Sequence, residues 1–426
     1  MRRPVCLLLS SLLLLCASHP LAAQKFQPKS IQFKGDPEYS DKELLAAANL
    51  KLGTVYTSAE MNDHSKLLMD SGVFQNLTYK FDGVDLTYSL IPAPNLYAVR
   101  LENLPLAAGP DLDAKLHDRF PLYHGKVPAE GGLLESVRGA LEDLLAAQGI
   151  KATITPTPYT DMATHKVSAM SFAITDPPVL IGDLRLDPAS PALEPKAQEI
   201  LSKQSGSAYA LDGSSNQIET NLSNFYRDKG YLEVTVKALQ QLTPVVAPDA
   251  VRIPFTVSFT PGPLYKVSAV KLAPGLLVTQ ADFDHQSGIH PGDLADHVRI
   301  TENWQYVARQ YHNKGYMKAV VKATQSLDHA QGTVSYAVNV DPGPVYAMGT
   351  LHIDNVSDEL RNTMLAAWKM PQGSVFNESV ILSFLAVDPT VNPTLARVFA
   401  SVKRNYSLTL NDETHTVDLI IKLEKR

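Results

Sequence analysis

The feature that most constrains the fold of this chain is a repeat. Seven of fifteen positions are identical between NFYRDKGYLEVTVKA at 224–238 and RQYHNKGYMKAVVKA at 309–323. Before the shared glycine, apolar residues recur with the period of a helix that buries one face, and after it they alternate as in a strand. Glycine readily adopts the left-handed conformation that ends a helix. The sequence therefore predicts a repeated helix–glycine–strand unit.

Two sets of residues recur with a period close to 80 residues. The helix-stopping glycines, separated by 77, 81 and 85 residues, are Gly72, Gly149, Gly230 and Gly315. The proline pairs that end alternating strands have as their last members Pro94, Pro178, Pro263 and Pro344. Because proline lacks a backbone donor and stiffens the chain, each pair is expected to end a strand and form a short linker.

This period divides the chain beyond residue 23 into five predicted repeats, 24–94, 95–178, 179–263, 264–344 and 345–426. Each is expected to follow the order β-α-α-β-β and to form a three-stranded mixed sheet covered by two helices, which is the α+β class.

Two further features concern the first and the last repeat. In the first, Ser40 with Glu43 and Thr57 with Glu60 have the spacing of capping boxes that open the two helices. The fifth diverges, because it lacks the helix-stopping glycine. It is expected to close with long strands at 397–410 and 414–425.

The N-terminus predicts export. Residues 1–23 combine two arginines, an apolar run too short to cross a bilayer and small residues at Ala22 and Ala23, as in a secretory signal peptide. Both cysteines, Cys6 and Cys16, lie in this segment, and the residue before Cys16 is not the small one of a lipoprotein site. A cysteine-free exported chain suits a bacterial periplasm. Five N-x-S/T triplets are compatible with a eukaryotic secretory route, but such triplets often arise by chance.

Composition and motifs argue against several functions. A net charge of −6 without a long basic run excludes an electrostatic nucleic-acid surface. The closest histidines, His285, His290 and His297, do not share a helical face, so they are predicted to be surface residues. We assign no catalytic, cofactor-binding or metal-binding residue, since no H-E-x-x-H or G-x-S-x-G motif occurs. The alternative from another class is a periplasmic hydrolase that assembles catalytic residues from distant positions on a repeat scaffold.

A periplasmic string of such units resembles an array of polypeptide-transport-associated (POTRA) domains. The residues that carry the resemblance are Gly230-Tyr231, Gly315-Tyr316, Gly72-Val73-Phe74, the Pro-Gly-Pro-x-Tyr segments at 261–265 and 342–346, and Phe33-Lys-Gly35. Five tandem units resemble the periplasmic arm of BamA-type outer-membrane protein assembly factors. The resemblance implies a non-enzymatic scaffold whose partners are unfolded outer-membrane proteins or subunits of the assembly machinery.

The resemblance also sets an expectation about the membrane. BamA-type factors follow the arm with a membrane β-barrel, and even the smallest barrel needs about 100 residues. Only 82 residues follow Pro344, and the fifth repeat uses them. We therefore expect a periplasmic arm without a barrel, possessing no cofactor and associated at most with the outer-membrane surface. The alternative is a fragment or split partner of a BamA-like insertase.

Sheet edges are the predicted binding sites. Edge strands expose unpaired N–H and C=O groups, and an extended client can add there with little demand on its sequence. The resemblance implies that the receptive strand follows the second helix, at Leu232–Lys237 and Met317–Lys322, with Val73–Tyr79 and Ile150–Ile154 as further candidates. The residues assigned to these edges are Leu232, Val234, Val236, Met317, Val320 and Lys322.

Two other residue types at these edges have a second interpretation. Lysines at 237, 318 and 322 are also the kind of residue that guards an edge against unwanted pairing, so both roles stay open. Tyr231 and Tyr316 have an alternative as aromatic recognition residues, but they are predicted to start a strand and pack beneath the second helix.

Overall fold

The computed structural model describes residues 25–35, 38–106, 109–241, 243–386 and 388–425. The predicted signal peptide, 1–23, lies outside these residues. The chain forms two compact units. The first unit contains the chain up to Asp183, Ser205–Ser214 and Gln240–Phe255, and the second contains Leu184–Gln204, Ser215–Leu239 and the chain from Thr256.

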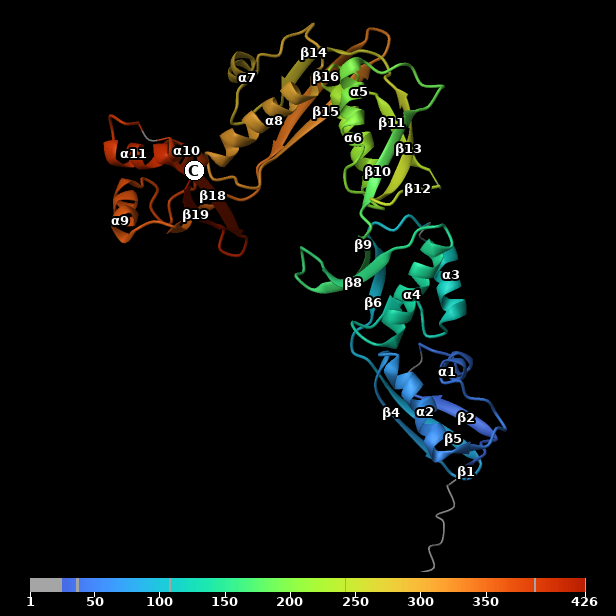
Figure 1. Ribbon diagram of the computed structural model, residues 1–426. Coiled ribbons are helices and arrows are strands. Elements are labelled where there is room, and N and C mark those ends of the chain that lie inside the picture. The colour runs from blue at the N-terminus through green and yellow to red at the C-terminus, as the bar shows by residue number, and fades with distance from the viewer. Residues whose placement is uncertain (1–24, 36–37, 107–108, 242, 387, 426) are drawn as a thin grey trace, which may run out of the picture. The chain divides into compact units, whose positions relative to one another are not determined.

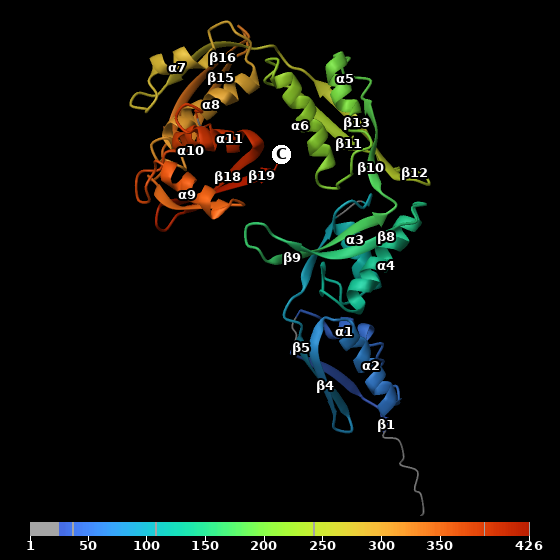
Figure 2. The ribbon, with the colours of Figure 1, turned by 60° about the vertical axis from the view of Figure 1, so that its left-hand side comes forward.

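The first unit begins with a sheet of three strands in the spatial order β2 (Ser30–Lys34), β5 (Asp85–Pro92) and β4 (Phe74–Phe81). The central strand β5 is parallel to β2 and antiparallel to β4. One face of the sheet is covered by α1 (Asp41–Ala47) and α2 (Ser58–Asp70), as Figures 1 and 2 show. Both helices open with the capping boxes that the spacing predicts. A short ladder pairs β1 (Lys25–Phe26) with β3 (Tyr56–Thr57).

The next sheet of the first unit has four strands, in the order β7 (Lys126–Val127), β6 (Tyr97–Leu101), β9 (Val167–Asp176) and β8 (Thr153–Thr160). Its helices are α3 (Pro110–Arg119) and α4 (Gly132–Ala146). Strand β6 is parallel to β9, and β8 is antiparallel to it.

A third sheet follows along the chain, in the order β10 (Val179–Leu186), β13 (Val251–Thr260) and β11 (Thr235–Gln240), with β12 (Val245–Val246) paired to β13. The helices in this part of the chain are α5 (Pro195–Ser202) and α6 (Ser214–Arg227).

The second unit contains two more three-stranded mixed sheets. One has the order β14 (Lys266–Leu272), β16 (Thr333–Asp341) and β15 (Val320–Asp328), with α7 (Gln280–Ser287) and α8 (His297–His312). The other has the order β17 (Ala347–Asp354), β19 (Thr416–Lys425) and β18 (Val402–Asn411), with α9 (Asp358–Ala367) and α10 (Glu378–Leu385). These mixed sheets and helices confirm the α+β class.

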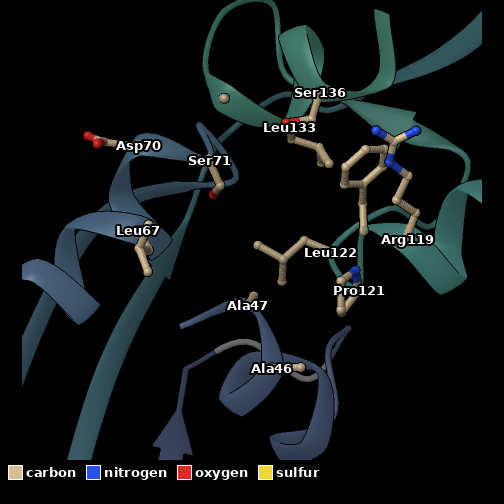
Figure 3. A pocket seen from close by; sticks show the side chains of 12 residues that line it. Ala46, Ala47, Leu67, Asp70, Ser71, Arg119, Pro121, Leu122, Leu133 and Ser136 are labelled. Carbon is tan, nitrogen blue, oxygen red and sulfur yellow. The ribbon is translucent and has the colours of Figure 1, made fainter. Parts of the chain in front are cut away.

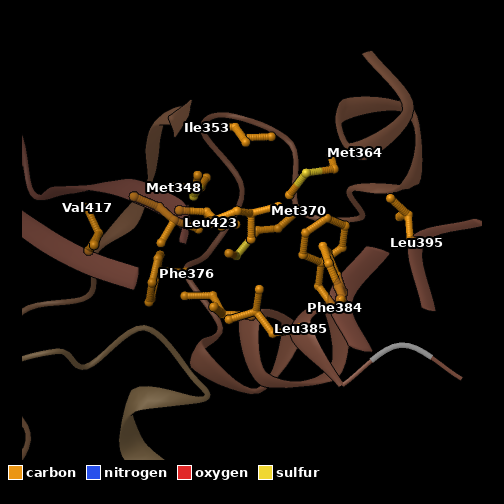
Figure 4. Close-up of a cluster of buried hydrophobic side chains, with 14 of the residues drawn as sticks. Met348, Ile353, Met364, Met370, Phe376, Phe384, Leu385, Leu395, Val417 and Leu423 are labelled. Carbon is orange, nitrogen blue, oxygen red and sulfur yellow. The ribbon is translucent and has the colours of Figure 1, made fainter. Parts of the chain in front are cut away.

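One element of the last sheet's neighbourhood contradicts the sequence prediction. Residues 397–401, expected to begin a strand, belong instead to a third helix, α11 (Pro393–Ser401), and β18 begins only at Val402. Asn392 opens this helix by accepting a hydrogen bond from the Leu395 N–H, and proline occupies the first turn. Leu395 and Phe399, four residues apart, are buried in the core drawn in Figure 4, so packing stabilises the helix.

The repeated glycine and tyrosine motifs form joints in the second unit. The carbonyl of Gly230 accepts a hydrogen bond from the Tyr265 N–H (2.9 Å), and that of Gly315 accepts one from the Tyr346 N–H (2.8 Å). Both tyrosine side chains are buried. Both glycines have positive φ, +89° and +85°, and a Cβ on either would lie 2.9 Å from the carbonyl oxygen of its tyrosine. Only glycine therefore fits between the end of one helix and the start of the next sheet.

The other predicted linker and helix-stop residues lie as follows. Pro263 and Pro344 lie in the strand-free stretches 261–265 and 342–346, between consecutive sheets. Gly72 has a φ of +79° and lies against Pro128 and the Glu130 carbonyl, whereas Gly149, with a φ of +81°, has open space beside it. Gly149 thus ends α4 without forming a joint.

Candidate functional site

The strand that follows the last helix of each repeat lies at a sheet edge, and for β18 that helix is α11 instead of the predicted second helix. Strands β4, β8, β11, β15 and β18 all stand at the end of their spatial order, beside a central strand that follows them in the chain. Figure 1 shows this arrangement most clearly for β15, which lies beside β16 and beneath α8. An edge strand has backbone donors and acceptors that its own sheet leaves unpaired.

The opposite edge of the same sheets is partly obstructed. In the second unit, Lys266 at the start of β14 forms an isolated antiparallel bridge with Leu294, and Ala347 at the start of β17 forms one with Val375. The register of both strands is also interrupted by an irregularity, between Val267 and Ala269 in β14 and between 348 and 351 in β17. A client strand therefore meets a shorter and less regular row of backbone groups on this side.

Strand β15 offers a long and regular edge. All nine of its residues pair with β16 without a break in register, from Val320 opposite Asp341 to Asp328 opposite Thr333. No other strand among the described residues pairs with β15. Strand β18 has a similar ten-residue ladder, from Val402 to Asn411. These two edges have the geometry that strand addition needs.

The remaining edges are less suited to a client strand. Strand β8 contains Pro156 and Pro158, and prolines within a sheet are confined to edges because they cannot donate a backbone hydrogen bond. Its register also shifts near both ends. The register of β4 shifts between Phe74 and Asn76, and β11 has only six residues. The chain therefore presents its most continuous open edges in the second unit.

The structure divides the residues that the sequence assigned to edges. Val320 and Lys322 lie on β15, where Val320 is 54% exposed and the Lys322 ammonium donates to Asp341 (3.1 Å). Val236 lies on β11 but is buried. Three assigned residues precede the strands, namely Leu232, Val234 and Met317.

The strands start later than predicted because local turns compete with the alternating pattern. The Tyr231 N–H donates to the Tyr226 carbonyl, which closes the end of α6, and the Val234 N–H donates to the Tyr231 carbonyl. The same turn recurs where the Ala319 N–H donates to the Tyr316 carbonyl. Strand β15 also runs on to Asp328, so sequence reasoning missed the segment 323–328, which is rich in short polar side chains.

The two tyrosines of the repeated motif pack against the helix that precedes them. The ring centroids of Tyr231 and Tyr226 are 5.8 Å apart, and those of Tyr316 and Tyr311 are 5.9 Å apart. These contacts agree with the prediction that both tyrosines pack under the second helix, although each lies in the turn before the strand.

A cavity of about 370 Å³ lies within the first unit (Figure 3). Its walls are mostly apolar and include Ala47, Leu67, Phe120 and Leu122. Ser71 reaches the same cavity, but its hydroxyl donates to the Leu68 carbonyl and accepts from the Val73 N–H. The residues that line this cavity include no histidine to act as a base for a serine.

Metal-ligand atoms converge at a place that the sequence did not reveal. The predicted surface histidines are not brought into a cluster of donors, and His290 is exposed. Within the described ranges, the converging set is Glu43, His117 and His124. Glu43 is far in the sequence from His117 and His124, and the three residues form no motif, so only the fold could have shown that they converge. No helix in the described part of the chain has the length and apolar character to cross a membrane.

The fold and its edges define a class: a tandem array of small α+β sheets with open edge strands. Comparisons with known proteins show which proteins this chain is similar to. Residues 28–92 and 265–343 match the POTRA family model, described as "Surface antigen variable number repeat". The outer membrane protein assembly factor BamA of Buchnera aphidicola is 20% identical over 371 residues, a match that covers 84% of this chain and 59% of that protein. The chain thus spans about three fifths of the length of this curated relative.

One solved structure with a similar chain is the BamA POTRA3-5 segment of Haemophilus influenzae, which is 15% identical to this chain. The match covers 58% of this chain and 96% of the Haemophilus chain, with a TM-score of 0.44. Another is POTRA1-3 of the periplasmic domain of Omp85 from Anabaena, with 19% identity, 59% and 97% covered, and a TM-score of 0.24. This chain resembles the POTRA arrays of BamA-type outer-membrane protein assembly factors, as the repeat and its motifs predict.

Proposed function

We propose that this protein is a non-enzymatic scaffold of outer-membrane protein assembly, exported to the periplasm and working at the inner face of the outer membrane. Its clients are extended segments of unfolded outer-membrane proteins, or segments of other assembly subunits, and it binds them by strand addition. The similarity to BamA over 84% of the chain supports the process. The uninterrupted nine-residue edge of β15 supports the mode of binding and carries the proposal.

Backbone hydrogen bonds explain how such an edge accepts many clients. The exposed side chains of β15 include Val320, Lys322, Thr324 and Ser326, which are small or flexible and leave room for a neighbouring strand. On the inner face, half-buried Val321 packs with the cluster around Val307 of α8, which fixes the strand in place. A rigid, regular edge binds through its main chain, so the client's sequence matters less than its ability to extend.

Site-specific photocrosslinking from the full chain tests this proposal. A photoreactive residue at Thr324 on β15 is compared with one at Lys271, which is exposed on the opposite edge strand β14 of the same sheet. We expect a peptide copied from an outer-membrane β-strand to crosslink at Thr324 and not at Lys271. The same peptide with alternate backbone nitrogens methylated should lose the crosslink, because it can no longer donate to the edge.

Equal crosslinking at the two positions, or crosslinking that survives N-methylation, would contradict strand addition at β15. Substituting the two positions one at a time leaves the core untouched, since both side chains are exposed. Misfolding therefore cannot account for a difference between them.

A second candidate follows from the length of the relative. Because the chain spans 59% of BamA, it could act as one part of a larger insertase instead of a free scaffold. Immunoblotting of fractionated cell envelopes distinguishes the two. A species of about the size of this chain, released with the periplasm, supports the scaffold, and a much larger species that resists extraction supports the insertase.

A further inference from the structure

Three side chains from separate parts of the first unit converge on one point. Glu43 lies on α1, His117 on α3 and His124 in the loop after α3. The Glu43 Oε1 atom is 3.0 Å from His124 Nε2 and 3.5 Å from His117 Nε2. One ligand atom from each residue lies within 4.8 Å of the others.

The ring of His117 is oriented as in a metal ligand. Its Nδ1 atom is 2.9 Å from the Tyr123 carbonyl oxygen. Since a carbonyl only accepts, Nδ1 carries the proton of the neutral ring and Nε2 presents its lone pair toward Glu43. A histidine that binds a metal almost always donates its other ring N–H to a carbonyl or carboxylate, which fixes both tautomer and orientation.

The carboxylate of Glu43 is held in the same manner. Its Oε2 atom accepts hydrogen bonds from the Ser40 N–H (2.7 Å) and the Ser40 hydroxyl (2.7 Å), as part of the capping box of α1. This leaves Oε1 directed at the two histidines. The capping interaction of α1 thus also orients a ligand atom.

We propose that Glu43, His117 and His124 bind one Zn²⁺ ion. Two histidines and one glutamate form a ligand set that binds zinc in a tetrahedral site and leaves the fourth position to water. Ligand atoms of such a site lie about 3.3 Å apart. The two separations from Glu43 Oε1, 3.0 and 3.5 Å, are close to this value, and the two histidine nitrogens lie within 4.8 Å of each other and approach when the ion binds.

The surroundings supply room for the fourth ligand and a path for the ion. The two histidines line a surface hollow of about 390 Å³, together with Asp113, Tyr123 and Gly125. The side chains of Glu43, His117 and His124 are 21%, 40% and 28% exposed, so a hydrated ion can reach them. The bound ion joins α1 to α3, which belong to consecutive sheets of the first unit, and so stiffens the connection between them.

Metal titration of residues 24–426, which is the chain after removal of the predicted signal peptide, tests the site. The protein carries no affinity tag. We expect one equivalent of Zn²⁺ to bind by calorimetry, and Co²⁺ to give the strong visible absorption of a tetrahedral complex. Replacing a ligand, as in His117→Gln or His124→Gln, should weaken Zn²⁺ binding by more than about tenfold. The control is His165→Asn, which removes an exposed imidazole from a turn of the same unit at a φ of +54° that asparagine tolerates.

Thermal unfolding supplies a second readout that separates a lost ligand from a damaged fold. Zn²⁺ should raise the melting temperature of the wild type and of His165→Asn, because a ligand that binds only the folded state stabilises it. His117→Gln should melt cooperatively without metal and gain nothing when Zn²⁺ is added. The absence of saturable Zn²⁺ binding by the wild type, or equal affinity in His117→Gln and His165→Asn, would overturn the proposal.

Discussion

Glycines that look alike in the sequence have different roles at the residue level. Gly315 and Gly275 both lie in the second unit and have nearly the same φ, +85° and +84°. A Cβ at Gly315 would lie 2.9 Å from the Tyr346 carbonyl oxygen and 2.9 Å from a methyl carbon of Val375, whereas a Cβ at Gly275 meets nothing within 4 Å. An alanine at either position would be strained in its backbone, but only an alanine at Gly315 would also clash with neighbouring atoms. Comparing the two variants therefore separates backbone strain from a steric clash at the joint.

We predict that Gly315→Ala lowers the free energy of unfolding much more than Gly275→Ala. The left-handed conformation alone costs an alanine about 1–2 kcal/mol, which both variants share. Overpacking at the joint adds about 1–3 kcal/mol in Gly315→Ala alone. Urea denaturation of the full chain measures the free energy of unfolding of each variant. Equal losses of stability in the two variants would show that the joint tolerates a methyl group.

How far single residues were predictable depends on how local their signal is. The capping pairs Ser40–Glu43 and Thr57–Glu60 are three residues apart, so the sequence revealed them directly. The histidines that join Glu43 are on another sheet's helix and loop, and no spacing rule reaches across that distance. Edge residues fall between these cases, since Val320 was placed on its strand correctly and Met317 was not.

At the level of elements, helix periodicity was a better guide than strand alternation. Helices α6 and α8 end three residues before Gly230 and Gly315, and both glycines have the positive φ that a chain leaving a helix requires. Strand starts were misplaced because the segments 231–234 and 316–319, predicted to open the strands after the two glycines, form turns. Helix α11 was missed because residues 397–401 were predicted to begin a strand, although Asn392-Pro393 is a recognisable signal for the start of a helix.

The prolines of β8 lead to a prediction about its edge. If Pro156 and Pro158 keep other strands away, replacing both with threonine should restore two backbone donors. We expect the double variant to crosslink the same outer-membrane strand peptide from a photoreactive residue at Tyr159, where the wild type does not. A variant of the two surface threonines Thr155 and Thr157 to alanine, which changes no backbone donor, is the control. Failure of the double variant to capture the peptide would mean that the prolines do not guard this edge.

A contact between a histidine of α8 and a glutamate of α10 predicts how the second unit responds to acid. The Glu378 carboxylate lies 3.0 Å from His312 Nδ1, and this hydrogen bond is the main cause that holds the pKa of Glu378 below its ordinary value of 4.5. A lowered pKa in the folded state contributes stability above the unfolded pKa, and this contribution is lost as the pH falls through the folded pKa. Acidification below about pH 4.5 should therefore weaken the contact.

We predict that Glu378→Gln lowers the free energy of unfolding at pH 7 by about 1–3 kcal/mol, because it leaves a half-buried polar partner poorly satisfied. Its stability should also fall less steeply than that of the wild type below about pH 4.5. Urea midpoints at several pH values measure both effects. Glu359→Gln on α9, an exposed position of the same unit, is the control and should follow the wild type. Parallel curves for Glu378→Gln and the wild type would refute this role.

At the level of the whole molecule, the repeat period predicts five domains, and the described residues form five sheets of three or four strands besides the two-stranded ladder of β1 and β3. The described residues also form two compact units, a grouping that no sequence pattern indicated, because it depends on contacts between sheets. The four predicted boundaries between domains, at residues 94, 178, 263 and 344, stay a prediction. So does the predicted end of the signal peptide at residue 23.

The charge balance of the chain leads to a final prediction about client binding. The 38 basic and 44 acidic residues give a net charge of only −6, and the exposed Lys322 on β15 is already paired with Asp341. If the edge recognises the client's backbone, the affinity for a neutral strand peptide should depend weakly on salt. We expect its dissociation constant to change by less than about threefold when the NaCl concentration rises from tens to hundreds of millimolar, since screening acts on charges and not on neutral hydrogen bonds. Fluorescence anisotropy measures the dissociation constant at each salt concentration. The matched variant Lys322→Gln should show the same weak salt dependence as the wild type. A steep salt dependence that disappears in Lys322→Gln would instead assign recognition to that charge.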